Sequence, residues 1–395
     1  MGLRQFSDPP LTAMVEALAG SPSVTLIVGA GVSAEAGLPA WRTLVHDLLD
    51  RGGRERLGLD DFDVRKAWVD QVLGGESPLG AAAVADALAG DALAEWIPDA
   101  LYGEDPGRFQ PGPIARQVPV LREAFGAGLR VVTTNYDDLL QQAFEDAGIG
   151  VAAAAFTGPA GPSVPPTDDA NQRISHLHGF LARDGTREGT VVLTEDDYQR
   201  VAQTDWQGSE VGAALMGGPC VFIGSSLTDP NLLRYLHVHT GPGSPRHFAI
   251  FTRQDAYPKG TPPEVIVARE EALTARWRSN NLEIVFVDHY AEIAVALAEV
   301  ARGKREGGDR PAAAAPRCLA SAGHRTAAPA AGRGGLRRGA GPAPRDPPNR
   351  ARRRRGDRDE PRLRPGRRGP RGHVVARRRC RRHAHELGDD GPRPS

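Results

Sequence analysis

The segment ISHLHGF, residues 174–180, holds the side chains best suited to proton transfer: two histidines two positions apart, with a glycine directly after the second. If this segment is a strand, His176 and His178 lie on the same face of it. Histidine exchanges protons near neutral pH, so the histidine beside Gly179 can act as a general base. A zinc pair and a buried structural histidine are the alternatives. Because no cysteine and no third ligand lie nearby, we expect no metal here.

A second polar group follows the apolar run of RVVTTNYDDLL, residues 130–140. A buried strand that ends near Thr134 delivers Asn135 and Asp137 at its carboxyl end, which is the edge of a parallel sheet where ligands bind. The alternative is that a side chain of this group caps the next helix. Asp137 or Asp138 could do so, which leaves Asn135, earlier in the turn, free to face the cleft.

A third motif, VTLIVGAGVSAEAGLPAW at residues 24–41, takes a strand into a glycine-rich bend and then into a helix opened by residues 33–37. Gly29 and Gly31 allow a close backbone approach to a phosphate, and a helix N-terminus offers unpaired N–H groups. The spacing departs from GxGxxG, because the third glycine is displaced to Gly37. A tight strand–helix turn without a ligand is the alternative.

The fourth motif, PCVFIGSSLTDPNL at residues 219–232, is another buried strand that ends in small residues. Gly224, Ser225 and Ser226 could hold a ribose or a phosphate. Asp229 and Pro230 start a helix, with proline at its favoured first-turn position. Taken alone, the motif is equally typical of an ordinary strand–helix turn.

The rest of the first 305 residues alternates short apolar runs with amphipathic ones, which indicates an α/β fold with a parallel sheet covered by helices on both faces. The expected strands are 24–28, 129–133, 220–223, 248–251 and 284–287. The expected helices are 11–18, 41–49, 119–125, 138–147, 232–236 and 291–300. Residues 60–101 show helical periodicity and many alanines, so we expect a helical insertion over about 55–110. A Gly/Pro-rich loop, 158–169, precedes the histidine segment.

Charge divides the chain, although 49 Lys and Arg balance 49 Asp and Glu overall. The first 309 residues carry 25 basic and 42 acidic residues, while the last 86 carry 24 Arg, no Lys and 7 acids. We therefore expect one domain, 1–305, and a basic low-complexity tail, 306–395, too poor in bulky apolar residues to fold. A nucleic-acid-binding arm, a disordered extension and GC-rich DNA translated in the wrong frame all fit this composition.

Three cysteines exclude a disulfide framework and a four-cysteine zinc site within the chain. No run approaches the roughly 18 apolar residues of a membrane span, and the first residues lack the apolar core of a signal peptide. We expect a cytoplasmic protein that does not bind a membrane.

The four motifs together resemble the sirtuin-like domains of bacteria, related to the silent-information-regulator proteins. In particular, the chain resembles the branch found in phage-defence effectors, over residues 24–300. The resemblance implies a Rossmann-like domain that binds NAD+ as its substrate. His178 matches the catalytic base of the family's His-Gly motif, and Asn135 and Asp137 match its strand-end residues. The implied NAD+-contacting residues are Gly29, Ala30, Gly31, Ser33, Pro39, Arg42, Thr134, Gly224, Ser225 and Ser226.

Departures from the deacylase pattern bear on the activity. Ala40 and Trp41 replace an Asp-Phe pair, Thr134 replaces a glutamine, and the four zinc cysteines are missing. The resemblance therefore implies an NAD+ glycohydrolase that forms ADP-ribose and nicotinamide, without zinc. A deacylase or ADP-ribosyltransferase, and a non-catalytic NAD+ or nucleotide sensor, are the alternatives. A homo-oligomer or an activating partner protein could control such an enzyme, and nucleic acid is a partner only if the tail is genuine.

Overall fold

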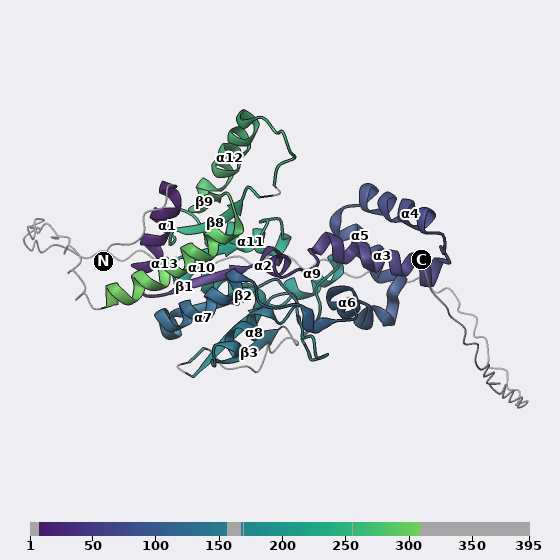
Figure 1. The fold of residues 1–395 in the computed structure, drawn as a ribbon, viewed down its shortest axis with the longest axis horizontal. Coiled ribbons are helices and arrows are strands. Elements are labelled where there is room, and N and C mark those ends of the chain that lie inside the picture. The colour runs from purple at the N-terminus through teal and green to yellow at the C-terminus, as the bar shows by residue number, and fades with distance from the viewer. Residues whose placement is uncertain (1–7, 156–166, 169, 255, 309–395) are drawn as a thin grey trace, which may run out of the picture. The chain divides into compact units, whose positions relative to one another are not determined.

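Seven parallel strands form the central sheet in the order β3-β4-β2-β1-β7-β8-β9 (Figure 1). The structure is a computed structural model, and it describes residues 8–155, 167–168, 170–254 and 256–308. The predicted α/β fold with a parallel sheet is confirmed. The strands are β1 Val24–Val28, β2 Leu129–Thr133, β3 Gly150–Ala155, β4 Asn171–His176, β7 Cys220–Ile223, β8 His247–Thr252 and β9 Leu282–Val287.

Helices cover both faces of the sheet because alternate strand residues point to opposite sides. On β1, Leu26 and Val28 join one buried cluster and Ile27 joins the other. Each fully buried side chain of this size contributes roughly 1.5–3 kcal/mol. The first cluster is covered by α1 Pro9–Ala19, α7 Pro113–Phe125, α8 Leu139–Asp146 and α13 Tyr290–Gly308. The second is covered by α10 Asp205–Gly217, α11 Pro230–His239 and α12 Pro263–Trp277.

The predicted helical segment between β1 and β2 has its own buried cluster, which includes Leu48, Val69 and Trp96. The same cluster contains Tyr136 and Leu139, which follow β2, so the segment packs directly on the carboxyl end of that strand. Its helices are α3 Trp41–Leu57, α4 Phe62–Gly75, α5 Pro78–Ala89 and α6 Leu93–Tyr102.

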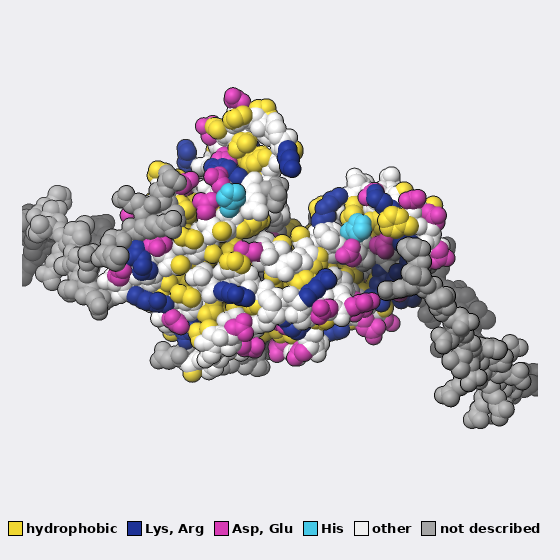
Figure 2. Space-filling view, in the orientation of Figure 1, with side chains coloured by type: hydrophobic (Ala, Val, Ile, Leu, Met, Phe, Trp, Pro, Cys, Tyr) yellow, Lys and Arg dark blue, Asp and Glu magenta, His cyan; other side chains and the backbone are white. Residues whose placement is uncertain are grey.

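Short elements complete the described chain. They are α2 Ala30–Glu35, α9 Glu195–Ala202 and an antiparallel pair of two-residue strands, β5 Phe180–Leu181 and β6 Arg187–Glu188. On the face drawn in Figure 2, acidic and basic side chains are interspersed over the sheet domain and the helical segment alike. Among the described residues, no helix is both long enough and apolar enough to span a membrane.

Three strands, β1, β2 and β7, lie where the sequence predicts them. Strand β8 extends beyond the prediction at both ends, and β9 begins earlier than predicted. The prediction that residues 174–180 form one strand is wrong in part, because β4 ends at His176. The helix expected to open at Ser33 begins earlier, at Ala30. The predicted loop 158–169 lies outside the described residues except for Thr167 and Asp168, and the predicted tail lies outside them from residue 309.

Candidate functional site

The loops that follow β1 and β7 pack against each other at the carboxyl edge of the sheet. The N–H of Gly29 donates to the carbonyl of Ile223, and the N–H of Gly31 donates to the carbonyl of Gly224, each over 2.9 Å. A Cβ on Gly29 would lie 2.6 Å from the oxygen of Gly224, and a Cβ on Gly31 would lie 2.8 Å from its Cα. Only glycine fits this approach. Closure of β1 onto β7 is therefore the role that the structure gives these glycines, before any ligand is considered.

Asn135 is the centre of a buried polar network at this edge. Its amide Nδ2 donates to the carbonyl of Gly29 over 3.1 Å and to Oγ of Ser33 over 2.7 Å. The carbonyl of Gly29 can only accept, so the orientation of the Asn135 amide is determined. Its Oδ1 is buried and has no hydrogen-bond partner in the described part of the chain. An acceptor left unpaired in this way costs free energy unless a ligand or water fills it.

Ser33 passes the network on to Asp137. The hydroxyl of Ser33 donates to Oδ2 of Asp137 over 2.6 Å, and Oδ1 of Asp137 accepts from the N–H of Leu139 at the start of α8 over 3.1 Å. Burial raises the pKa of Asp137, and these two hydrogen bonds act against that rise. Both carboxylate oxygens are thus used inside the protein. The structure places Asp137 behind Asn135 as an anchor and a helix cap.

His176 supports the network from the other side, because β4 ends on it. Its Nδ1 lies 2.9 Å from the carbonyl of Asn135 and its Nε2 lies 2.6 Å from Nε2 of Gln141. The carbonyl only accepts, so Nδ1 carries the proton and Nε2 accepts from the Gln141 amide. Burial lowers the pKa of His176 to about 4, which keeps the ring neutral. His176 therefore holds the backbone of Asn135.

His178 lies beyond the end of β4, so the predicted common face with His176 does not exist. Its Nε2 lies 3.1 Å from Oδ2 of Asp229, and both side chains are largely buried. The same oxygen accepts from the hydroxyl of Tyr198 over 2.6 Å, and Oδ1 accepts from the N–H of Leu232 over 2.7 Å. The sequence indicated Asp229 only as a helix start. Its contacts with His178 and Tyr198 join residues far apart in the sequence, so no local sequence pattern predicts them.

The predicted residues in the loop after β7 form contacts within that loop. Ser225 accepts at Oγ from the N–H of Leu227 over 3.2 Å, and the hydroxyls of Ser226 and Thr228 lie 2.6 Å apart. Gly224 has a φ of 66°, a conformation that favours glycine.

The predicted residues nearest to the helical segment are less closely tied to the network. Thr134 extends the pairing of β2 with β1, since its N–H donates to the carbonyl of Val28 over 3.1 Å. Ala30 and Pro39 are half-buried. Arg42 is exposed on the first turn of α3, and its charge is felt by Asp70 on α4. Among the described residues, no hydrogen bond or ion pair joins Arg42 to the Asn135 network.

The helical segment is held onto this edge by buried hydrogen bonds. The hydroxyl of Tyr102 at the end of α6 donates to the carbonyl of Leu181 over 2.7 Å. Arg183 donates through Nε to both carboxylate oxygens of Asp138 and through Nη1 to the carbonyl of Phe109. These contacts tie the turn after β2 and the turn after His178 to the helices.

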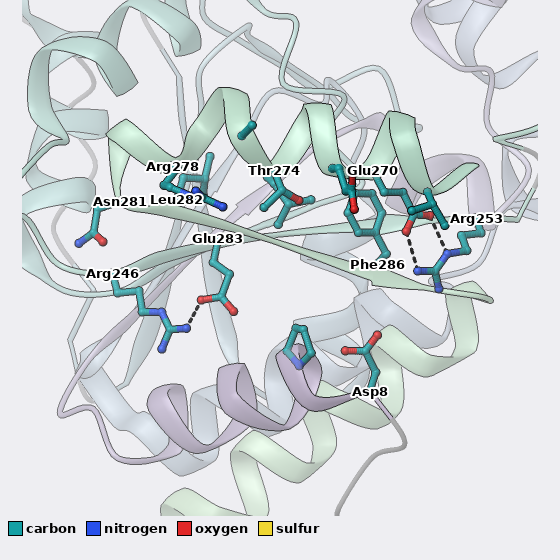
Figure 3. Close-up of a pocket in the computed structure, with 15 residues that line it drawn as sticks. Asp8, Arg246, Arg253, Glu270, Thr274, Arg278, Asn281, Leu282, Glu283 and Phe286 are labelled. Atoms are coloured by element: carbon teal, nitrogen blue, oxygen red, sulfur yellow. Dashed lines mark hydrogen bonds and ion pairs between the residues drawn. The ribbon is translucent and has the colours of Figure 1, made fainter. Parts of the chain in front are cut away.

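A separate groove of about 870 Å³ lies at the other edge of the sheet, between α12 and β9 (Figure 3). Arg253 donates to both oxygens of Glu270 over 2.7 and 2.8 Å, and Arg246 pairs with Glu283. The charges that line it are largely neutralised by each other.

Residues 129–285 match the family model of the SIR2-like domain. The chain carries a SIR2-like domain. The matched region contains Asn135, His178 and the loop after β7, whereas the glycine-rich loop after β1 precedes it. Among the described residues, no group of three or more His, Cys, Asp or Glu side chains is placed to bind a metal ion.

Among curated proteins, the chain is similar to the uncharacterized protein y4cA of Sinorhizobium fredii, with 26% identity over 240 residues. The match covers 59% of this chain and 19% of that protein. Similar solved structures include a Sir2 homologue in complex with NAD, with 16% identity, a TM-score of 0.38 and coverage of 78% of this chain and 97% of that chain. A mutant Sir2 homologue in complex with ADP ribose has 17% identity, a TM-score of 0.35 and coverage of 75% and 96%.

Proposed function

We propose that the SIR2-like domain is an NAD+ glycohydrolase, which cleaves NAD+ with water to ADP-ribose and nicotinamide. The observation that carries the proposal is Oδ1 of Asn135, a buried acceptor without a hydrogen-bond partner among the residues that the structure describes. The amide nitrogen of the same side chain is fully used by Gly29 and Ser33. A site with one free acceptor suits a ligand that donates, such as a ribose hydroxyl or a water molecule.

The position of this acceptor supports a nucleotide substrate. It lies at the carboxyl edge of β1, β2 and β7. The chain passes from β1 to β2 on one side of β1 and later adds β7 on the other side, and ligands of open parallel sheets bind at such a point. Gly29 and Gly31 let the loops after β1 and β7 pack together at that edge. The family resemblance adds NAD+ as the nucleotide.

The residues present can carry out the hydrolysis. When nicotinamide leaves with the electron pair of its bond to the ribose, positive charge develops on the anomeric carbon. A water molecule adds to that carbon and gives up a proton. Asn135 orients the hydroxyl or the water through Oδ1, and His178 takes up the proton as general base. Ser33 and Asp137 hold Asn135 in place.

Product analysis tests the proposal against the transfer reactions. The full chain is incubated with NAD+ in water enriched in ¹⁸O, and the products are separated by chromatography and analysed by mass spectrometry. From the wild type we expect equal amounts of nicotinamide and ADP-ribose, with one ¹⁸O atom in the ADP-ribose. From His178→Ala we expect neither product. Nicotinamide without free ADP-ribose, with mass added to a protein, would instead identify an ADP-ribosyltransferase. Binding of NAD+ without any product would identify a sensor.

We also propose that this activity depletes cellular NAD+ as a defence effector, which rests on the family resemblance alone. Bacteria that express the full chain should lose NAD+ and stop growing during phage infection, and bacteria with His178→Ala should not. Equal NAD+ levels in the two infected cultures would reject the defence role and leave the hydrolase proposal intact.

A further inference from the structure

We propose that Asp229 is a positioning residue for His178: its carboxylate holds the proton of the neutral imidazole on Nε2 and leaves Nδ1 as the nitrogen that accepts a proton. The inference rests on the proposed function for its catalytic consequence, but the geometry that carries it is independent of any substrate. It concerns a contact between three separate elements: the turn after β4, helix α9 and the first turn of α11.

The carboxylate of Asp229 is held rigidly. Its Oδ1 caps α11 through the N–H of Leu232, over 2.7 Å. Its Oδ2 faces the hydroxyl of Tyr198 at 2.6 Å and Nε2 of His178 at 3.1 Å. Because the cap determines which oxygen points at the imidazole, the carboxylate cannot turn away without losing the start of the helix.

The charge on Asp229 persists although the side chain is largely buried. Burial alone would raise the pKa of this carboxyl group. The interaction with His178, together with hydrogen bonds from Tyr198 and Leu232, outweighs that effect and lowers the pKa to about 2. An ionised carboxylate accepts and never donates, so the ring nitrogen that faces it must carry a proton.

The two phenol rings near the imidazole are neutral. Tyr198 on α9 contacts the ring edge-on, with centroids 5.3 Å apart, and Tyr136 lies 6.5 Å away. Burial and the nearby carboxylates raise the pKa of both phenols, so neither carries charge. Asp197, also on α9, is engaged by Thr194 and Arg200. Asp229 is therefore the carboxylate that acts directly on His178.

The proton balance is simple. Nε2 of the ring lies 3.1 Å from Oδ2 of Asp229, and in the proposed tautomer it carries the proton, which leaves Nδ1 as the accepting nitrogen. During hydrolysis Nδ1 takes the proton released by the attacking water, and the resulting cation is stabilised by Asp229, which stays ionised. The proton leaves to solvent once ADP-ribose has departed.

Asp229→Asn tests the assignment with little change in shape. The asparagine Oδ1 can still cap α11, which places its amide nitrogen opposite Nε2 of His178. That amide donates, so the imidazole must present a lone pair at Nε2 and carry its proton on Nδ1, where the base is needed. We expect kcat to fall about 10³-fold with KM changed less than about threefold.

The tautomer itself can be measured without activity. In the ¹⁵N spectrum of the full chain labelled at histidine, the signals of His178 are identified by their absence in His178→Gln. We expect the Nε2–H tautomer in the wild type and the Nδ1–H tautomer in Asp229→Asn. If the asparagine variant fails to fold, Asp229→Ser keeps a capping hydroxyl and removes the charge. The matched control is Asp61→Asn, which makes the same change at the exposed cap of α4.

Three results would overturn the proposal: an Nδ1–H tautomer in the wild type, an unchanged tautomer in Asp229→Asn, or a kcat of that variant equal to the wild-type value. A wild-type protein that releases no nicotinamide would refute the proposed hydrolase, while the ¹⁵N spectra would still decide whether Asp229 sets the tautomer of His178.

Discussion

Two regions of the sheet, the groove beside the outer strand β9 and the carboxyl ends of β1 and β2, differ in how their polar groups form hydrogen bonds. In the groove beside α12, Arg253 and Glu270 bind each other through two hydrogen bonds, and the arginine side chain is 32% exposed. At the carboxyl edge of β1 and β2, Asn135 is only 7% exposed and its Oδ1 has no partner within the described part of the chain. The open groove offers volume, and the buried edge offers an unmet hydrogen bond.

The difference shows that volume alone does not locate chemistry in this fold. Paired charges near solvent are worth about 0–1 kcal/mol and need no further partner. A buried acceptor without a donor costs about 1–3 kcal/mol unless a ligand or a water molecule supplies the donor. We therefore assign substrate binding to the Asn135 edge, and each variant below tests that assignment.

The largest effect is expected from Asn135→Ala. The substitution removes the free acceptor together with the two hydrogen bonds that hold the loop after β1, so NAD+ cleavage should fall about 10³-fold. Nicotinamide release measured by chromatography checks this. The matched control is Asn280→Ala, another buried asparagine, whose amide donates to Thr240 at a distance from this edge. Cleavage that survives in Asn135→Ala, or is lost equally in the control, would contradict the assignment.

Two buried histidines, one on β4 and one on β8, should make the free energy of unfolding depend strongly on pH. Burial lowers the pKa of His176, and of His247 on β8, to about 4. Because the folded state binds these protons more weakly than the unfolded state, stability is full above about pH 6.5 and is lost as the pH falls toward 4. Each histidine should contribute up to about 3 kcal/mol of that loss.

Urea unfolding at pH 7.5 and pH 5 measures this effect. Replacement of either histidine by glutamine should reduce the difference in unfolding free energy between the two pH values. Only His176→Gln should also lower NAD+ cleavage, since His247 lies on a strand away from the Asn135 network. An unchanged pH dependence in both variants would show that neither ring is held neutral.

Ser33→Ala should have an intermediate effect. It removes the hydroxyl that accepts from Asn135 and donates to Asp137, but leaves the bond from Asn135 to Gly29. We expect a stability loss of about 1–2 kcal/mol and a roughly tenfold loss of NAD+ cleavage, because Asn135 is held less firmly. Thermal unfolding and steady-state kinetics measure the two effects. A stability loss without any kinetic change would remove Ser33 from the site.

The smallest effect is expected in the groove. Arg253→Ala breaks two partly exposed ion pairs, with Glu270 and Asp288, so the free energy of unfolding should change by no more than about 1–2 kcal/mol and NAD+ cleavage should not change. Isothermal titration with NAD+ should give the wild-type affinity. A weaker affinity in this variant would move the nucleotide site to the α12 edge.

The parts of the fold that follow from local sequence could be predicted. The strands at 24–28, 129–133 and 220–223 are short segments rich in apolar and β-branched residues, with clear ends. Strand β3 was missed because its sequence, GVAAAA, is mostly alanine, which has a low preference for strands. This segment is a strand because it pairs with β4, a long-range contact that the local sequence does not indicate. Helix α10 was missed because its glycines and polar residues hide the helical period.

The site shows the same limit. Asn135 and His178 could be singled out because each sits beside a strand end with a recognisable motif. The roles of His176 and Asp229 could not, since they depend on contacts with Asn135 and His178 that only the folded chain creates. For the glycines after β1 the residues were predicted, but their packing against Gly224 depends on a loop almost 200 residues away in sequence.

The most direct test of the central claim is nicotinamide release from NAD+ by the full chain, its His178→Ala variant and the control His247→Ala, each at several protein concentrations. The account predicts release by the wild type and the control, and none above background by His178→Ala. Release at the wild-type rate by His178→Ala would contradict it, and so would a wild-type protein that binds NAD+ yet releases no nicotinamide at any concentration.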